Sequence, residues 1–317
     1  MIIIENGEIL KLKHPVITTG TFDGLHLGHQ KVISQTISIA KQKNGTPVIF
    51  TFWPHPRHVL GKGTFNLLNT LEEKRLLMSR LGIEYVYCQT FTKDFANLSS
   101  EEYIKNILVD KIGVKTLVVG YDHQFGKERT GKFDTLGEFA KQFDFELHKV
   151  EALDFNGLNV SSTKIRNALE IGDINQANKM LGYDYFISGN VVEGLKNGRK
   201  IGFPTANIKL NDELKLLPSN GVYAAYAELE GIIYPGMLNI GFRPTIENQT
   251  HKKTIEINLF NFSRDIYNMP IRIYFIEKLR AEIKFNGLKE LTDQLKIDKE
   301  NSQKLLLSIP KMPDSLM

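Results

Sequence analysis

The sequence has one cysteine, no long apolar run and no basic tract, and each absence excludes a class of protein. Cys88 is the only cysteine among 317 residues, so no intrachain disulfide can form. No segment approaches the about 18 uninterrupted apolar residues of a membrane span. The N-terminal segment MIIIENGEILKLK carries Glu5 and Glu8 rather than the basic start of a signal peptide. We therefore expect a cytoplasmic protein without a membrane partner.

The composition is that of an ordinary globular protein, with 42% hydrophobic and 24% charged residues. The length predicts about two domains. A net charge of +4 suits anionic small molecules as well as nucleic acid. Basic and aromatic residues are not interleaved as in nucleic-acid-binding proteins, so we expect no nucleic-acid partner. The sequence does not specify an oligomeric state, and the apolar run 85–88 predicts that Cys88 is a small buried side chain.

The first 182 residues alternate between strand and helix patterns. Helix ends are marked by capping boxes at Thr70/Glu73 and Ser99/Glu102, and by Gly82 and Gly113 at left-handed C-caps. The predicted strands are 16–19, 47–52, 84–88, 115–119 and 145–150. This alternation predicts an α/β domain with a parallel, Rossmann-like sheet covered on both faces, which binds its ligand beyond the carboxyl ends of the strands.

The pattern changes after two short helices, 162–170 and 174–181, the second capped by Asp173. The following strands have a period of two, clearest where Ile255, Ile257 and Leu259 alternate with polar residues. The predicted strands are 185–192, 222–229, 232–239, 254–260 and 271–276, and residues 287–307 are predicted to form a helix packed on them. We expect a small antiparallel barrel or sandwich, with domains at 1–182 and 183–310.

The first motif, TTGTFDGLHLGH at residues 18–29, joins a predicted strand to a helix. Gly20 and Gly24 would let the backbone turn sharply, and Gly28 would let a phosphate approach the main chain. His26 and His29 are three residues apart, so both rings project to one side of the first helical turn. Two imidazoles at a helix N-terminus suit a triphosphate. The alternative is that the histidines only cap the helix.

Two further segments are predicted at the same edge of the sheet. The glycine-rich loop 120–131 follows a strand. Ser162 and Thr163 stand at a helix start with Arg166 one turn on, where they could bind phosphate oxygens. The alternative is an ordinary N-cap with an exposed arginine.

The second motif comprises residues 189–194, GNVVEG, and 198–207, GRKIGFPTAN, which we interpret as glycine-rich loops around phosphates. Pro204 fixes the approach to Thr205, whose hydroxyl suits Mg²⁺, and Asn207 adds a carbonyl oxygen. The alternative is a plain Gly/Pro turn. Glu256 lies on the polar face of an alternating strand, where most glutamates are only solvated, but a kinase acting on an alcohol needs such a carboxylate as base.

The first half resembles the nucleotidyltransferase module of the bacterial bifunctional riboflavin kinase/FAD synthetases in the segments TFDGLHLGH, TFWPHP, GYDHQFG and SSTKIR. The resemblance implies transfer of AMP from ATP to the phosphate of FMN, with release of pyrophosphate. It implies that His26 and His29 bind the phosphates of ATP. Two residues, Trp53 and His123, differ from those usual in the family. The implied nucleotide-binding residues are Gly20, Phe22, Asp23, Gly24, Gly28, Asp122, Arg129, Ser162, Thr163 and Arg166.

The second half resembles the riboflavin kinase domain of the same family in GNVVEGLKNGRKIGFPTANI, LPSNGVYAAYA, LNIGFRPTI, IEINLFNF and LRAEIKF. The resemblance implies a six-stranded antiparallel barrel with Mg²⁺–ATP at Thr205 and Asn207 and Glu256 as catalytic base. The other implied nucleotide-binding residues are Gly198, Arg199, Gly202 and Pro204. Asn268 stands where the family usually has glycine, and asparagine tolerates positive φ.

The resulting hypothesis is a bifunctional enzyme that uses ATP and Mg²⁺ to convert riboflavin to FMN and then FMN to FAD. One alternative is a kinase whose first domain is inactive or uses another substrate. The other, RNA or regulatory binding, rests only on the calculated pI of 8.8.

Overall fold

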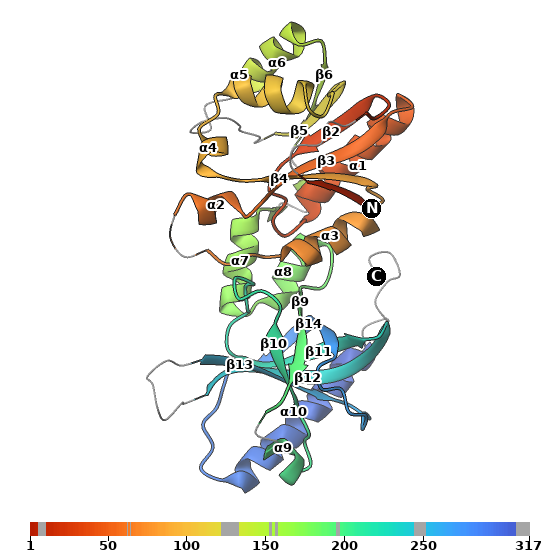
Figure 1. The fold of residues 1–317 in the computed structure, drawn as a ribbon. Coiled ribbons are helices and arrows are strands. Elements are labelled where there is room, and N and C mark those ends of the chain that lie inside the picture. Colours follow the sequence, from red (N-terminus) through yellow and green to blue (C-terminus); the bar gives the residue numbers. More distant parts are fainter. Residues whose placement is uncertain are drawn as a thin grey trace. The chain divides into compact units, whose positions relative to one another are not determined.

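The chain forms two compact units in the computed structural model, Met1–Ser161 and Ser162–Met317 (Figure 1). The structure describes residues 1–5, 11–61, 63, 65–121, 133–151, 154–155, 158–194, 197–243 and 252–308. The helices α7 (Ser162–Ile171) and α8 (Ile174–Leu181), which the sequence pattern assigns to the end of the first domain, are part of the second unit. The boundary at 182/183 stays a prediction, and each unit is described by itself.

The first unit is built on a six-stranded parallel sheet of order β1-β4-β3-β2-β5-β6. Its strands are β1 (Ile2–Glu5), β2 (Pro15–Thr19), β3 (Thr46–Trp53), β4 (Tyr85–Thr90), β5 (Thr116–Gly120) and β6 (Glu146–Val150). The five predicted strands are confirmed within two residues at each end, and the edge strand β1 was missed. A two-stranded ribbon of β7 (Asp154–Phe155) and β8 (Leu158–Asn159) follows.

Helices cover both faces of this sheet, as predicted. Helix α1 (Leu27–Gln42) packs Ile39 and Ala40 on one face, against Val16 and Val118. The other face packs on α6 (Phe133–Gln142) and on a π-helical segment, η1 (Tyr103–Val109), that the sequence pattern did not reveal. The remaining helices are α2 (Pro56–Val59), α3 (Leu71–Arg80), α4 (Lys93–Ala96) and α5 (Ser100–Glu102). Cys88 is buried, as predicted.

The predicted helix caps are confirmed. Thr70 and Glu73 form a complete capping box at α3, and Ser99 and Glu102 form another at α5. Asp173 caps α8 by accepting a hydrogen bond from the backbone of Gln176. Gly82 and Gly113 have φ angles of 81° and 73°, in the left-handed region. Local side-chain chemistry thus sets where these helices begin and end.

The second unit is a closed antiparallel barrel of order β10-β13-β12-β11-β14-β9. Its strands are β9 (Phe186–Val192), β10 (Ala206–Leu210), β11 (Gly221–Leu229), β12 (Ile232–Arg243), β13 (Lys252–Leu259) and β14 (Pro270–Arg280). The six-stranded barrel is confirmed. The predicted strand 185–192 is confirmed as β9, so the interpretation of residues 189–192 as a loop is wrong, and Asn207 lies in β10 rather than in a loop. Gly189 is needed because a Cβ there would lie 2.4 Å from the carbonyl oxygen of Lys209.

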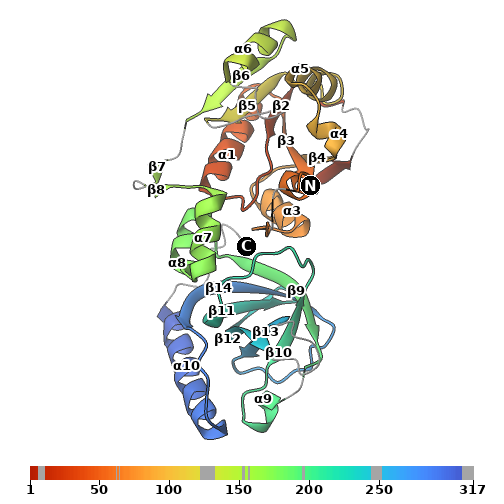
Figure 2. The ribbon, with the colours of Figure 1, turned by 90° about the vertical axis from the view of Figure 1, so that its left-hand side faces the viewer.

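The barrel interior is filled by alternate residues, including Leu238, Ile255 and Ile257. Asn268 has a φ of 63°, in the left-handed region that asparagine tolerates better than most residues. Helix α10 (Leu288–Ser308) is the predicted C-terminal helix, and Figure 2 shows it along the outside of the barrel. Among the described residues, no helix is both long enough and apolar enough to cross a membrane.

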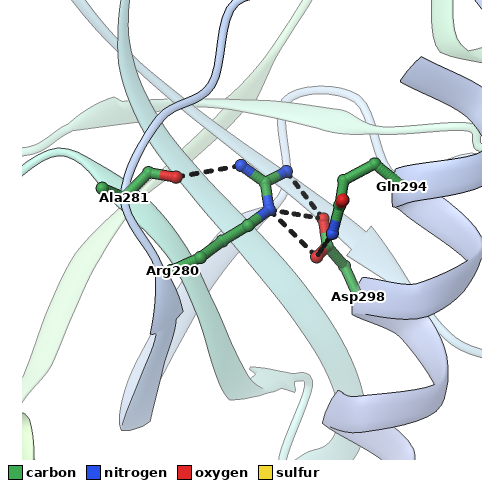
Figure 3. A network of polar contacts seen from close by, with 4 residues as sticks. All are labelled: Arg280, Ala281, Gln294 and Asp298. Atoms are coloured by element: carbon green, nitrogen blue, oxygen red, sulfur yellow. Dashed lines mark hydrogen bonds and ion pairs between the residues drawn. The ribbon is translucent and has the colours of Figure 1, made fainter. Parts of the chain in front are cut away.

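A buried ion pair attaches α10 to β14 (Figure 3). The Arg280 guanidinium donates through Nε to Asp298 Oδ1 at 3.0 Å and through Nη2 to Oδ2 at 2.7 Å. Asp298 also accepts from Gln294 at 2.9 Å, and Arg280 donates to the carbonyl oxygen of Ala281. The same helix packs with Phe203 and Met237 in one apolar cluster, so it supports the segment that precedes β10.

Candidate active sites

In the first unit, a tight turn leads from β2 to α1. The Gly20 N–H donates to the carbonyl oxygen of Phe50 at 3.1 Å, which ties the turn to β3. Gly24 adopts a φ of 87°, as its role in a sharp turn predicts, and Phe22 and Leu25 have φ angles of 47° and 38°. Gly20 has no positive φ; its missing side chain instead leaves room for the Phe22 ring, 3.3 Å from where a Cβ would stand.

The two histidines stack on each other at the start of α1. Their ring centroids are 3.6 Å apart with an interplanar angle of 15°. His26 is the N-cap, and its Nδ1 accepts a hydrogen bond from the backbone of His29 at 3.3 Å. A Cβ at Gly28 would lie 3.2 Å from the His26 ring, so this glycine leaves space for the ring beside the helix N-terminus. The turn therefore places two stacked imidazoles next to the partial positive charge at the N-terminus of α1.

Burial keeps both imidazoles neutral near pH 7. Desolvation lowers the pKa of His26 to about 4, against the opposing effect of the Asp23 carboxylate. The pKa of His29 is lowered well below its ordinary value by burial and then by the nearby His26 and Lys74 charges. Within the described residues, His29 Nδ1 is buried without a hydrogen-bond partner. A phosphate anion placed here would supply an acceptor and favour protonation of the rings.

Neighbouring backbone and side chains hold this turn. The Asp23 carboxylate accepts hydrogen bonds from the backbone of Leu68 and Asn69, at 3.1 and 3.4 Å. Lys74, in the first turn of α3, donates from Nζ to the carbonyl oxygen of Thr21 at 2.7 Å. The sequence gives no sign of this role of Lys74, because one lysine in a charged helix carries no signal that it is buried.

The other residues expected at the adenylylation site belong to the second unit or lie outside the described residues. Ser162 and Thr163 form the first turn of α7 and Arg166 follows one turn later, all in the second unit. Asp122 and Arg129 lie outside the described residues, as does most of the loop 120–131. The structure therefore brings together Gly20, Phe22, Asp23, Gly24, His26, Gly28 and His29 within one turn.

On the barrel, three expected residues that are distant in sequence meet on the outer face. Thr205 Oγ1 donates to Glu256 Oε2 at 3.2 Å. Asn207 on β10 stands directly opposite Glu256 on β13, and Asn239 on β12 stands opposite Glu256 on its other side. Directly opposed residues of antiparallel strands point to the same face. Asn239 was missed because its strand had no glycine-rich motif to mark it.

The segment before β10 is a helical turn followed by an extended stretch. Gly198 lies in α9 (Asn197–Lys200), which corrects its assignment to a loop, and its carbonyl oxygen accepts from the backbone of Phe203 at 2.9 Å. Asn258 Nδ2 donates to the carbonyl oxygen of Pro204 at 2.6 Å. Gly202 has a φ of 81°, and Arg199 is exposed. The segment is thus fixed to β13 one residue before Thr205.

Glycine also makes room for Asn207. A Cβ at Gly194 would lie 2.1 Å from Asn207 Nδ2, so only glycine allows the amide its position. The face then offers a hydroxyl, an amide oxygen and a carboxylate, which are hard donors of the kind Mg²⁺ prefers. The described residues contain no group of three or more His, Cys, Asp or Glu side chains with metal-site geometry. The donor set fits a Mg²⁺ that arrives with ATP.

Known protein families match both halves of the chain. The sequence model of the FAD synthetase family matches residues 9–164, and that of the riboflavin kinase family matches residues 181–306. The bifunctional riboflavin kinase/FMN adenylyltransferase of Bacillus subtilis is 40% identical over 301 residues, covering 93% of this chain and 94% of that protein. The protein of the same name from Listeria monocytogenes is 38% identical and covers 91% of each chain.

A solved structure has the same fold over nearly the whole chain. It is described as a macrolide-efflux protein from Streptococcus pneumoniae, is 30% identical, and has a TM-score of 0.87. The match covers 96% of this chain and 99% of that one.

Proposed function

The chain belongs to the bifunctional riboflavin kinase/FMN adenylyltransferase family, and on that premise we propose how its residues divide the two reactions. The enzyme phosphorylates riboflavin to FMN with ATP, and it adenylylates FMN to FAD with release of pyrophosphate. The observation that carries the assignment is the Thr205–Glu256–Asn207 cluster on the barrel, which is a different place in the chain from the histidine turn.

In the kinase reaction, Glu256 orients the riboflavin hydroxyl and accepts its proton. The hydroxyl oxygen then bonds to the γ-phosphorus of ATP, and the bond from that phosphorus to ADP breaks. The Thr205 hydroxyl donates a hydrogen bond to Glu256. The lone pairs of the Thr205 oxygen therefore remain available for a cation. Thr205 and Asn207 would hold a Mg²⁺ that offsets phosphate charge. The rest of the nucleotide contacts are assigned to the segment before β10, at Gly198, Arg199, Gly202 and Pro204.

In the adenylylation, the histidine turn receives the phosphates of ATP. A phosphate oxygen of FMN bonds to the α-phosphorus, and the bond between that phosphorus and the pyrophosphate breaks. His26, His29 and the N-terminus of α1 stabilise the charge of the departing group. We assign the remaining nucleotide contacts to Ser162, Thr163, Arg166, Asp122 and Arg129 on the strength of the family motifs.

The alternative of an inactive first domain is disfavoured by the geometry of its turn. A turn without function has no reason to keep two stacked, neutral histidines beside positive-φ residues. We further propose that both reactions use Mg²⁺ carried by ATP and that the enzyme works in the cytoplasm. A tightly bound zinc or iron that survives dialysis and is required for turnover would contradict the metal assignment.

A double dissociation tests the assignment. His29→Ala should leave FMN formation intact and stop FAD formation, so FMN accumulates from riboflavin, ATP and Mg²⁺. Glu256→Ala should leave riboflavin unconverted while supplied FMN still becomes FAD. The loss in the second variant should be roughly 10²–10⁴-fold, the usual effect of a positioned base. Chromatography of the flavins measures FMN formation and FAD formation in both variants.

The fold of each variant is checked by circular dichroism. Loss of both activities in His29→Ala with an unchanged spectrum would show that the two reactions share a site, and the assignment would be wrong.

A further inference from the structure

Lys74 is a buried cation that the reactions described above do not use. Its side chain lies in the first turn of α3 and the residue is only 2% exposed. Burial lowers the pKa of its ammonium, and the Asp23 carboxylate opposes that effect. Because a buried charge is unfavourable unless its surroundings compensate it, a lysine at this place calls for an explanation.

Its contacts connect it to the histidine turn. Nζ donates to the carbonyl oxygen of Thr21 at 2.7 Å, and the indole ring of Trp53 lies 5.9 Å from the same atom. Two residues further along the turn, Asp23 is held by the backbone of Leu68 and Asn69, just before α3. Residues 68–74 therefore hydrogen-bond to the turn at two places, Thr21 and Asp23, and the contact of Lys74 with Thr21 is the one nearer to β2.

The turn needs such support because its backbone is strained. Phe22 and Leu25 have positive φ angles of 47° and 38° without being glycines. Such conformations persist only where the surroundings over-determine them, and they cluster at functional sites. Immediately beyond them, His26 caps α1 and stacks on His29. Any relaxation at Thr21 would be passed directly to the two histidines.

We propose that Lys74 is a positioning residue for adenylyl transfer, whose ammonium fixes the Thr21–His26 turn and places a fixed positive charge behind it. When the bond between the α-phosphorus and the pyrophosphate breaks, the leaving group takes the bonding electron pair. Negative charge therefore grows beside the turn in the transition state. A cation already in place stabilises that state more than the ground state and needs no reorganisation. Lys74 itself gives up no proton in this step.

This inference rests on the proposed role of the histidine turn, and the test separates the two. Lys74→Met nearly keeps the volume of the side chain, one atom shorter, but removes its charge. We expect kcat for FAD formation to fall roughly 10²-fold, as for loss of one preorganised donor, with KM for ATP within about threefold. Riboflavin kinase activity should be unchanged.

The matched control is Lys43→Met in the same unit, which removes the partly exposed pair of Lys43 with Glu146 and should leave both activities unchanged. His29→Ala is measured in parallel. If His29→Ala retains FAD formation, the proposed function fails. If His29→Ala loses FAD formation but Lys74→Met keeps kcat within threefold, or changes only KM, the inference on Lys74 alone fails.

A rescue experiment separates charge from packing and covers the case that Lys74→Met does not fold. Lys74→Ala leaves a cavity where the side chain was. Added n-propylammonium should restore FAD formation about tenfold, whereas 1-propanol, which has the same number of heavy atoms without the charge, should not. Equal rescue by propanol, or none by the amine, would overturn the inference.

Discussion

The two proposed sites of this enzyme are built in opposite ways. The histidine turn is a short contiguous segment with positive-φ residues, buried rings and titratable groups whose pKa values are lowered. The barrel site is a half-exposed face on which oxygen-bearing side chains from β10 and β13 meet by strand pairing. The first depends on local strain held by neighbours, and the second on long-range register. Perturbations of backbone, charge and packing should therefore separate the two activities.

The largest expected effect is on the attachment of α10 to the barrel. Asp298→Ala leaves the buried Arg280 guanidinium without its carboxylate, which should lower the free energy of unfolding of the barrel by roughly 3–5 kcal/mol. Kinase activity should then be lost at a lower temperature, while the sheet of the first unit keeps its heat resistance. Residual kinase activity after heating measures the first effect, and hydrogen exchange of the β1–β6 backbone amides measures the second.

The control is Asp293→Ala on the same helix, whose pair with Lys296 is exposed and should contribute less than about 1 kcal/mol. If the heat resistance of both units falls equally in Asp298→Ala, the two units do not unfold independently.

Arg166→Ala should act on FAD formation alone. A guanidinium one turn into α7 can pair with phosphate oxygens as a charged fork, so kcat/KM for ATP should fall about 10²-fold. Kinase activity should stay near that of the wild type. Lys164→Ala, an exposed cation on the same helix, is the control for net charge. Equal loss of FMN formation would show that Arg166 has been assigned to the wrong reaction.

Acid should weaken the first unit through His26. The folded pKa of about 4 lies below the ordinary 6.5, so the unfolded chain binds the extra proton between these values. The stabilising contribution is complete above pH 6.5 and is lost as the pH falls through this window toward 4. At pH 5 the loss is about 2 kcal/mol for this group.

The second unit should show the opposite sign through Asp184. Burial raises the pKa of this carboxyl from 3.8 to about 6, so the folded state binds the extra proton and gains stability as the pH falls from 6 to 4. Unfolding of each unit, followed at pH 7 and pH 5 by hydrogen exchange of its backbone amides, tests the pair. His26→Gln should flatten the pH response of the first unit only, and an unchanged acid sensitivity of that unit in the variant would contradict the assignment.

The smallest expected effect comes from one added methyl group. Gly194→Ala would place a Cβ 2.1 Å from Asn207 Nδ2, so the amide must shift and kinase kcat/KM should fall about tenfold. FAD formation should not change. Gly137→Ala, in α6 with no heavy atom within 4 Å of its Cβ position, controls for the substitution itself. Full kinase activity in Gly194→Ala would show that the position of Asn207 is not critical.

Local signals in the sequence predicted much of the fold. Thr70 and Glu73 could be recognised as a capping box because the two residues interact within one turn. The period of two in β13 predicted that Glu256 faces away from the barrel interior. Both depend only on near neighbours, so no knowledge of the tertiary structure was needed.

What could not be predicted depends on distant partners. Strand β10 was missed because the glycines and proline just before it are typical of a loop, whereas its pairing with β9 and β13 makes it a strand. The burial of Lys74 follows from a contact with Thr21, far away in sequence. The unit to which α7 and α8 belong is likewise a matter of packing, since Asn178 hydrogen-bonds to the carbonyl oxygen of Phe275.

The edge strand β1 has a consequence for colloidal behaviour. It pairs in register with β4, from Ile2 opposite Tyr85 to Glu5 opposite Cys88, and so covers the hydrogen-bonding edge of an apolar strand. Uncovered edges of this kind act as templates for pairing with another chain. A variant whose β1 cannot pair would therefore precipitate through β4 well before either catalytic centre was lost. By pairing with β4, residues 2–5 protect the protein from aggregation.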